Sequence, residues 1–443
     1  ESFMSVALTT LLLFTALLLL IFSGVPLAFA IGSIAVVFGV LEWGPASVHL
    51  LFGHVQSAIF NYTLASIPFF MLMASFLGKS GIAEDIYSLI HVLFGRLRGG
   101  LAVGTVLGCT VIASMTGVSA LGVVAMGTLA LPVMLARGYD SKLSMGTIMA
   151  GGGLGQLFPP SLLGIVYSGL ASVSIGKVFL AGVGPGVLLV ILFCGYCLVR
   201  CAINPSMGPA APAGENEKPS AGQVFMLVVR VIPCFILIGL VLGSLFLGVA
   251  SPTESAGLGA AGALVIAVLR GRMALADLRN ALLDTVKSTS MILWLALSSL
   301  MLVSVYSGTG GDDFVRGLLI GQNLQPWIVV ALMMIIIFFL GLIMDPVGII
   351  FLTTPIFLPV INEIGYDPLW YGGLLILNLE MAYITPPFGY NLFYMKSVAP
   401  PGITMADIYR STPPFVLLQL LALILCAALP ELITWLPNKL LGA

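Results

Sequence analysis

The stretch Leu131-Pro132-Val133-Met134-Leu135-Ala136-Arg137-Gly138-Tyr139-Asp140 returns in the second half of the chain as Leu358-Pro359-Val360-Ile361-Asn362-Glu363-Ile364-Gly365-Tyr366-Asp367. A Pro-Pro pair follows each copy, at Pro159-Pro160 and at Pro386-Pro387. Pro132 to Pro359, Gly138 to Gly365 and Pro159 to Pro386 each span 227 positions. Because one offset holds over three separate motifs without a gap, the sequence predicts an internal duplication.

The composition places this duplication in a membrane. The 443 residues are 59% hydrophobic and only 8% charged, whereas an ordinary soluble domain has about 25% charged residues. The formal net charge is −1, and the chain has no basic stripe, so nucleic acid is not expected as a partner. We therefore predict an all-α polytopic membrane protein whose surface faces the lipid bilayer.

Apolar runs near the length that a spanning helix needs, about 20 residues, predict the crossings of the bilayer. The predicted full passes are 4–22, 26–41, 56–78, 143–170, 178–200, 224–248, 256–269, 281–305, 370–398 and 413–435. Two further apolar stretches, 101–136 and 328–361, are too long for one pass and are interrupted by polar or helix-breaking residues at 114–119 and 344–348. We expect these two stretches to form re-entrant helical hairpins, beside about 10–12 transmembrane helices. The alternative is two short full passes for each stretch.

The order of the passes predicts how the two copies are oriented. Five full passes separate Asp140 from Asp367, and an odd number places the second copy upside down. Lys and Arg gather in loops on one side, which is typical of cytoplasmic loops, and both termini then face the periplasm. A Pro-, Gly- and charge-containing linker at 204–222 divides the chain into a first repeat, 1–203, and a second repeat, 223–443.

Each repeat is predicted to supply one hairpin and one helix that is broken at its Pro-Pro pair. Proline removes a backbone N–H and clashes with the preceding turn, so a break frees carbonyl groups. Freed carbonyls suit a cation such as Na⁺, and the N-terminus of a half-helix suits an anion. Inverted repeats with broken helices are typical of secondary transporters, whose binding site lies where the repeats meet at the bilayer midplane.

Two hairpin tips carry the candidate cation ligands. Ser114, Thr116, Gly117 and Ser119 crowd the first tip, where hydroxyl and carbonyl oxygens either hold a cation or cap the two half-helices. Asp345 interrupts the second hairpin. An unpaired carboxylate at that depth costs about 3 kcal/mol, so Asp345 is expected to be paired, protonated or ion-bound. The alternative is an N-cap with Pro346 at the first helical position.

Polar residues and glycines beside the two breaks are candidates for substrate binding. Glu380 lies inside an apolar pass about one turn before the second break, where it is expected to coordinate an ion, carry a proton or pair with a buried Arg or Lys. Glu254 fits better as part of a helix-capping box with Ser251 and Pro252. The substrate-binding candidates are Gly152, Gly153, Pro160, Asn378, Glu380 and Asn391.

The sequence lacks the motifs of several enzyme classes. No Gly-x-x-x-x-Gly-Lys-Ser/Thr loop is present, so the chain is not expected to hydrolyse ATP, and an ion gradient or another subunit must supply the energy. The chain also has neither a His-Glu-x-x-His nor a Gly-x-Ser-x-Gly motif. A membrane-embedded enzyme is a remote alternative, because only the buried carboxyl groups Asp345 and Glu380 favour it. We predict that the protein is not an enzyme.

Along nearly its whole length the chain resembles the large membrane (permease) subunit, the DctM-like component, of tripartite ATP-independent periplasmic (TRAP) transporters within the ion-transporter superfamily. The motifs that carry the resemblance are Thr116-Gly117-Val118-Ser119, Leu131-Pro132 through Gly138-Tyr139-Asp140, Ser251-Pro252-Thr253-Glu254, and Asn378-Leu379-Glu380 through Thr385-Pro386-Pro387-Phe388-Gly389-Tyr390-Asn391-Leu392-Phe393. At the first tip Gly117-Val118-Ser119 departs from the Gly-Ser-Ser of one branch, so the substrate stays open.

The resemblance implies a prokaryotic inner-membrane importer that is driven by Na⁺ and uses no organic cofactor. It implies a small organic anion as substrate, a soluble periplasmic binding protein that delivers it, a small membrane subunit of about four helices, and an elevator motion. The family's sodium sites map onto Ser114, Thr116, Gly117, Ser119, Asp345, Gly348, Thr385 and Pro386. An ion-coupled anion carrier that needs no binding protein is the alternative.

Overall fold

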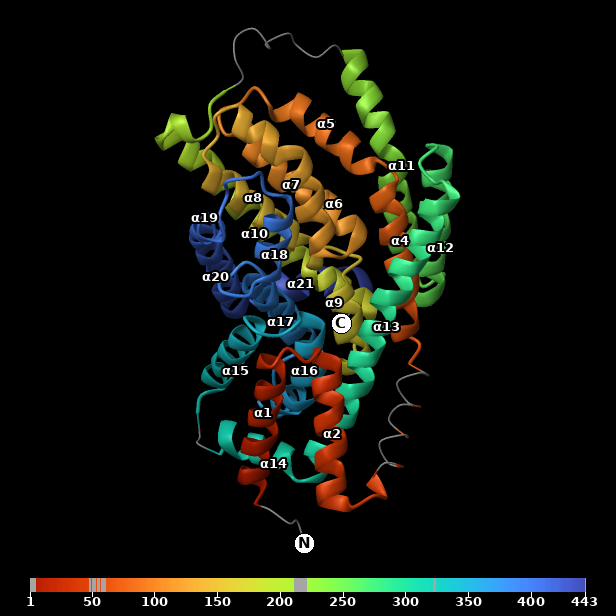
Figure 1. The fold of residues 1–443 in the computed structure, drawn as a ribbon, viewed down its shortest axis with the longest axis vertical. Coiled ribbons are helices and arrows are strands. Elements are labelled where there is room, and N and C mark those ends of the chain that lie inside the picture. The colour runs from red at the N-terminus through yellow and green to blue at the C-terminus, as the bar shows by residue number, and fades with distance from the viewer. Residues whose placement is uncertain are drawn as a thin grey trace.

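The computed structural model describes residues 5–47, 49, 53, 56, 61–210, 221–321 and 324–442, and this part of the chain forms helices and no strand (Figure 1). Seven of its helices are long and apolar enough to cross a membrane, or eight if one bent pair counts as a single span. The prediction of an all-α polytopic protein is confirmed. Residues 57–60 of the predicted pass 56–78 and residues 211–220 of the predicted linker lie outside the described residues.

The first half of the described chain is helical, with short 3₁₀ turns between some of the helices. They are α1 (Val6–Phe22), α2 (Leu27–Trp43), α4 (Ile67–Lys79), α5 (Ile82–Phe94), α6 (Gly100–Thr116), α7 (Ser119–Ala136), α8 (Ser141–Gly153), α9 (Leu162–Ala171) and α10 (Ile175–Ile203). Asp140 starts α8, because its side chain accepts a hydrogen bond from the amide of Leu143 at 2.9 Å.

The second half continues with helices that include the longest of the described chain, the 34-residue α13. They are α11 (Ala221–Phe246), α12 (Pro252–Leu269), α13 (Leu275–Gly308), α14 (Gly311–Leu319), α15 (Pro326–Gly341), α16 (Pro346–Glu363), α17 (Pro368–Tyr383), α18 (Tyr390–Val398), α19 (Met405–Ser411), α20 (Pro413–Ala428) and α21 (Glu431–Leu441). The predicted capping box at the start of α12 is confirmed, since Ser251 and Glu254 bond each other's backbone amides.

Both predicted hairpin stretches are two helices joined by a short break. In the first, α6 ends at Gly117, whose φ of +66° is left-handed, and the extended Val118 leads into α7. In the second, residues 342–345 separate α15 from α16. The pair α6 and α7 lies in the upper half of Figure 1 and the pair α15 and α16 in the lower half, so the two pairs occupy opposite parts of the molecule.

The two predicted broken helices are also broken in the structure. A 3₁₀ turn (Leu154–Gln156) and irregular backbone at 157–161 separate α8 from α9, and irregular backbone at 384–389 separates α17 from α18. The Pro-Pro pairs lie in these two segments, and both Pro-Pro peptide bonds are cis. Breaks therefore occur where proline removes the helical hydrogen bond.

The structure corrects several predicted boundaries. Residues 79–98, predicted as a loop, contain the amphipathic helix α5, and the short helices α14 and α19 also escape a search for apolar runs. The predicted single pass 413–435 is divided into α20 and α21. Besides the seven or eight longer spans, the described chain has shorter apolar helices of 10–17 residues at several of the predicted passes, among them α1 and α2.

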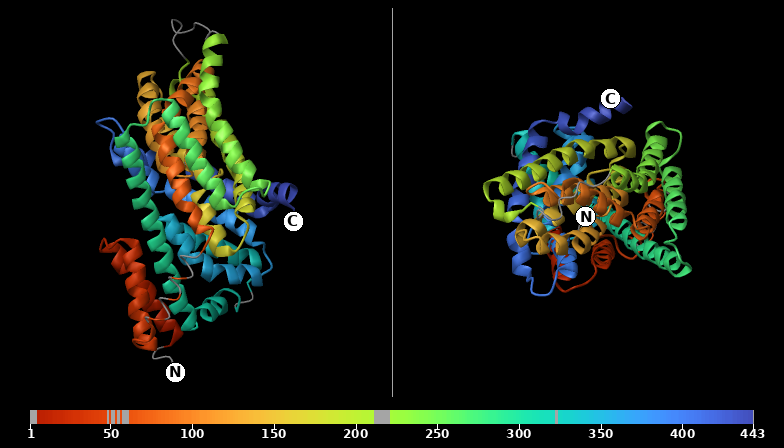
Figure 2. Two further views of the ribbon diagram at one scale, coloured as in Figure 1. Left: turned by 90° about the vertical axis from the view of Figure 1, so that its right-hand side faces the viewer. Right: turned by 90° about the horizontal axis from the view of Figure 1, so that it is seen from above.

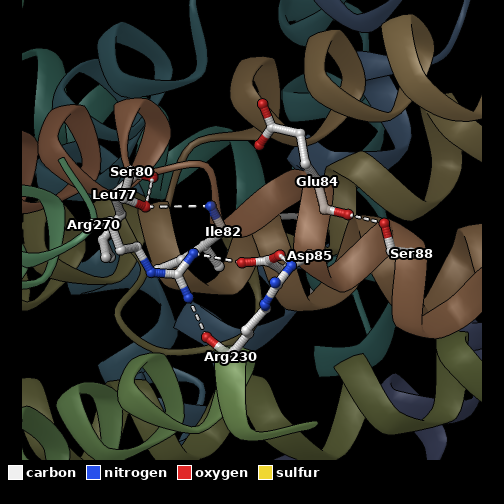
Figure 3. A network of polar contacts seen from close by, with 8 residues as sticks. All are labelled: Leu77, Ser80, Ile82, Glu84, Asp85, Ser88, Arg230 and Arg270. Atoms are coloured by element: carbon white, nitrogen blue, oxygen red, sulfur yellow. Dashed lines mark hydrogen bonds and ion pairs between the residues drawn. The ribbon is translucent and has the colours of Figure 1, made fainter. Parts of the chain in front are cut away.

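An ion-pair network holds α5 to the second half of the chain (Figure 3). The carboxylate of Asp85 accepts a 2.5 Å contact from Arg270 at the end of α12 and lies 3.7 Å from Arg230 of α11. Arg270 also donates to the backbone carbonyl of Arg230. In Figure 2, α11 and α12 lie along one side of the molecule, whereas the broken helices lie nearer its middle. Asp85 thus connects the segment before the first hairpin to this lateral pair.

Candidate functional site

The tip of the first hairpin contacts the broken helices of both halves through a buried polar chain. The Ser119 hydroxyl at the start of α7 donates to Asn391 Oδ1 at 2.6 Å, and Asn391 Nδ2 donates to the Met149 carbonyl of α8 at 3.0 Å. Ser119 is 1% exposed and Asn391 is 0% exposed. The structure therefore joins a predicted Na⁺ ligand, Ser119, to a predicted substrate ligand, Asn391, although they are far apart in sequence.

Backbone packing brings the same tip against the first helix break. A Cβ atom on Gly117 would overlap the Pro160 carbonyl oxygen, so only a glycine permits this approach. A Cβ atom on Gly155 would likewise overlap the backbone of Ala113 near the end of α6. Thus two predicted site residues, Gly117 and Pro160, lie in close backbone contact.

The hydroxyl groups of the first tip do not cap α7. The N-cap position is Val118, and no side chain bonds the first amides of that helix. Thr116 donates within α6, to the Ala113 carbonyl at 3.1 Å, and half-buried Ser114 donates to the Val111 carbonyl at 2.8 Å. The hydroxyl hydrogen atoms of Thr116 and Ser114 are thus used in bonds to backbone carbonyls. The lone pairs of the two hydroxyl oxygens are left to act as acceptors. No side chain of this tip therefore caps the start of α7, whereas the Gly117 amide caps the end of α6 by donating to the Ala113 carbonyl at 2.8 Å.

At the second tip a side chain does cap the following helix, as the capping alternative predicts. Asp345 Oδ1 accepts from the amides of Val347 at 2.9 Å and Gly348 at 3.4 Å, and Pro346 occupies the first helical position of α16. A Cβ atom on Gly348 would overlap the Leu27 side chain of α2. A capping role does not conflict with ion binding, because the second carboxylate oxygen makes no capping bond.

The remaining second-half candidates lie along α17 and its break. Thr385 donates to the Met381 carbonyl at 2.7 Å, next to Pro386 in the break, and no hydrogen bond of the described chain joins either residue to Asp345 or Gly348. Asn378, which is fully buried, donates to the Met334 carbonyl of α15 at 2.7 Å. Asn378 therefore ties α17 to the second hairpin.

Glu380 is fully buried between the two halves. Gln419 of α20 donates to its Oε1 at 3.3 Å, and a Cβ atom on Gly153 would lie 3.0 Å from the same oxygen. The partner is thus a neutral amide, and among the described residues no Lys or Arg forms an ion pair with Glu380. The adjacent Gly152 packs against Val123 of α7, where a larger side chain would overlap.

Sequence reasoning missed two groups of this site. Gln419 interrupts an apolar run in α20, and an isolated amide in such a run was a signal that it needs a buried partner. The carbonyl of Met149 carried no signal, because every residue has one. No cluster of three or more His, Cys, Asp or Glu side chains able to hold a metal ion occurs in the described chain.

Comparison with known proteins gives the family. The sequence profile described as "Tripartite ATP-independent periplasmic transporter, DctM component" matches residues 14–432. The C4-dicarboxylate TRAP transporter large permease protein DctM of Pseudomonas aeruginosa is 31% identical over 404 residues, which cover 90% of this chain and 92% of that protein. The ectoine/5-hydroxyectoine TRAP transporter large permease protein UehC of Ruegeria pomeroyi is 29% identical over 369 residues, 81% of this chain and 82% of that protein.

A solved structure shares the fold. The crystal structure of the Alcanivorax borkumensis YdaH transporter, described as having an unusual topology, superposes with a TM-score of 0.65 at 14% identity and covers 97% of this chain and 99% of that one. The chain is a multi-pass membrane protein that belongs to the DctM family, the large permease component of tripartite ATP-independent periplasmic transporters.

Proposed function

We propose that the chain is the membrane-translocating subunit of a Na⁺-coupled secondary importer. In this proposal it lies in a prokaryotic inner membrane with both termini in the periplasm. A periplasmic binding protein delivers a small organic anion to it, and a small membrane subunit of about four helices completes the complex. The wider class, a transporter permease, is supported by the family.

The observation that carries the proposal is the buried contact of the first hairpin tip with both helix breaks. Ser119, Asn391 and the Met149 carbonyl form one hydrogen-bonded chain, and Gly117 lies on Pro160. A break in a spanning helix leaves backbone carbonyls without amide partners, and buried protein or a lined site must satisfy them. Hard oxygen ligands of this kind suit Na⁺, and Thr116 and Ser119 add hydroxyl oxygens beside them.

The relatives narrow the substrate class. Their names specify C4-dicarboxylates and ectoines, which share a carboxylate group. The first amides of α18 have no side-chain cap, and they begin beside the second break. An uncapped helix N-terminus attracts negative charge through its free N–H groups and its dipole. We therefore place the substrate carboxylate near the start of α18, close to Asn391.

The proposed movement is an elevator motion. The hairpins and the broken helices contact one another through Ser119, Asn391 and Asn378, so they are suited to move as one body. The pair α11 and α12 lies at the side of the molecule and is suited to remain with α4 and α13 as a scaffold (Figure 2). An inverted duplication of the two halves supports alternating access by such a motion.

Transport by the reconstituted complex tests the proposal. The protein is placed in liposomes with its small membrane partner, and binding protein loaded with a labelled C4-dicarboxylate or ectoine is added under an imposed Na⁺ gradient. Uptake should require Na⁺ and should stop when K⁺ replaces Na⁺ at the same ionic strength. Uptake of the substrate at the same rate in K⁺ would refute the coupling, and full uptake without the binding protein would establish the alternative of an independent carrier.

A further inference from the structure

Glu380 and Gln419 form an isolated polar pair in an otherwise apolar interface. Glu380 lies on α17 and Gln419 on α20, and both side chains are 0% exposed. Gln419 Nε2 donates to Glu380 Oε1 at 3.3 Å. On its other side Glu380 meets the backbone of Gly153, where a Cβ atom would come within 3.0 Å of Oε1. The pair therefore joins three helices at the level of the first helix break.

The pair leaves two buried oxygen atoms without a partner. Glu380 Oε2 and Gln419 Oε1 are both buried, and neither receives a hydrogen bond. An ionised carboxylate only accepts hydrogen bonds, and so does the carbonyl oxygen of Gln419. A charged Glu380 Oε2 and Gln419 Oε1 therefore cannot form a hydrogen bond with each other. A buried charge without a counter-ion is also far more costly than a neutral group, because the interior cannot replace its hydration. A charged Glu380 is thus unfavourable here for two reasons: among the described residues its Oε2 lacks a hydrogen-bond donor, and its charge lacks a counter-ion.

One proton removes both difficulties. We propose that Glu380 is a buried proton-binding site and that its neutral carboxyl group forms a cyclic acid–amide pair with Gln419. In this pair Gln419 Nε2 donates to Glu380 Oε1, and the carboxyl O–H on Oε2 donates to Gln419 Oε1. The proton is taken up from water when the carboxylate becomes neutral, and no other bond is made or broken. Every polar atom of the two side chains then has a partner.

The neutral pair explains how the two broken helices pack together. A charged side chain at this buried position would require hydration that the packed interface does not supply. A neutral acid–amide pair fits against Gly153 and ties α20 to α17, which carries the second break. Glu380 is then a positioning residue that holds the break, rather than a ligand of Na⁺ or the counter-charge of an anion. This inference is independent of the proposed Na⁺ coupling.

Isosteric variants separate this pairing from a charged role. Glu380→Gln replaces the O–H with an N–H of the same shape, so an amide–amide pair retains both hydrogen bonds. Glu380→Ala and Gln419→Leu each remove one partner. The double variant Glu380→Gln with Gln419→Glu exchanges the two groups and restores one acid facing one amide. The full-length protein is purified in detergent, and its unfolding midpoint in sodium dodecyl sulfate is measured for each variant.

The expected result is a ranked series of midpoints. Glu380→Gln and the exchanged double variant should unfold at the wild-type midpoint, and Glu380→Ala and Gln419→Leu should unfold at lower detergent. Infrared difference spectra of wild type against Glu380→Gln at neutral pH should show loss of a carbonyl stretching band of a neutral carboxylic acid. The proposal is overturned if Glu380→Gln is as unstable as Glu380→Ala, if it fails to fold, or if the lost band is that of a carboxylate. Neither readout depends on transport, so a failure here leaves the test of Na⁺ coupling unaffected.

Discussion

Substituting Ala for Gly117 should destabilise the protein for two reasons that can be separated. The φ of Gly117 is +66°, and an L-residue in this left-handed region loses about 1–2 kcal/mol relative to glycine. The new Cβ would also overlap the carbonyl oxygen of Pro160. That neighbour is backbone rather than the end of a flexible side chain, so the tip or the break must shift. Overpacking of this kind costs about 1–3 kcal/mol.

Gly365 provides the matched control. It has a φ of +80°, and no atom lies within 4 Å of the position of its Cβ. Gly365→Ala should therefore lose only the backbone contribution, about 1–2 kcal/mol, whereas Gly117→Ala should lose about 2–5 kcal/mol from both contributions. The difference between the two variants measures the contact of the first hairpin tip with the first helix break.

The free energy of unfolding of both variants is measured by titration of the purified protein with sodium dodecyl sulfate. Limited proteolysis at low detergent checks that each variant starts from the folded state. Equal losses for Gly117→Ala and Gly365→Ala would refute the reasoning, because they would mean that the tip does not press on the Pro160 carbonyl. A loss in Gly117→Ala of less than about 1 kcal/mol would also contradict the left-handed geometry.

Three further predictions concern the site and its supports. Ser119→Ala and Asp345→Ala should each weaken the apparent Na⁺ affinity for uptake without reducing expression. Thr128→Ala, at an exposed position of α7, is the control. Wild-type Na⁺ dependence in both variants would leave Ser119 and Asp345 with structural roles alone. In a double-mutant cycle, Ser119→Ala and Asn391→Leu should show a coupling of about 0.6–1.7 kcal/mol, the range for hydrogen bonds between helices in membranes, and additive losses would exclude the bond. Asp85→Asn should destabilise the attachment of α5 by about 1 kcal/mol. Proteolysis near α5 should become faster, and its rate should no longer depend on salt as it does in wild type. Unchanged cleavage would show that the contacts with Arg230 and Arg270 do not hold the helix.

Sequence patterns predicted the elements best where one physical signal dominated. The breaks at Gly117 and at the two Pro-Pro pairs followed from the backbone chemistry of glycine and proline. The amphipathic helix α5 was missed because its buried residues recur at helical spacing while charged residues lie between them, and a search for continuous apolar runs does not detect this pattern. The division between α20 and α21 was missed because hydropathy continues across Pro430.

The candidate site shows what a single sequence leaves undecided. The crowding of polar residues marked Ser119, Asn391 and Glu380 as residues to examine. It did not give their partners, since Ser119 and Asn391 are 272 positions apart and the Met149 carbonyl is invisible to any residue-type argument. Partners at such separations are set by how the helices pack.

By itself, the sequence determined the membrane setting and the places where helices break, and its constant offset of 227 positions predicted a duplication. Composition and the covalent limits of proline and glycine are properties that each segment has on its own. Only the tertiary structure decided which hydrogen-bond donor meets which acceptor in the candidate site. Hydrophobic burial is non-directional and fixes which segments pack together only approximately. The hydrogen bonds of Ser119, Asn391 and Gln419 depend on distances of about 3 Å that arise once those segments have met.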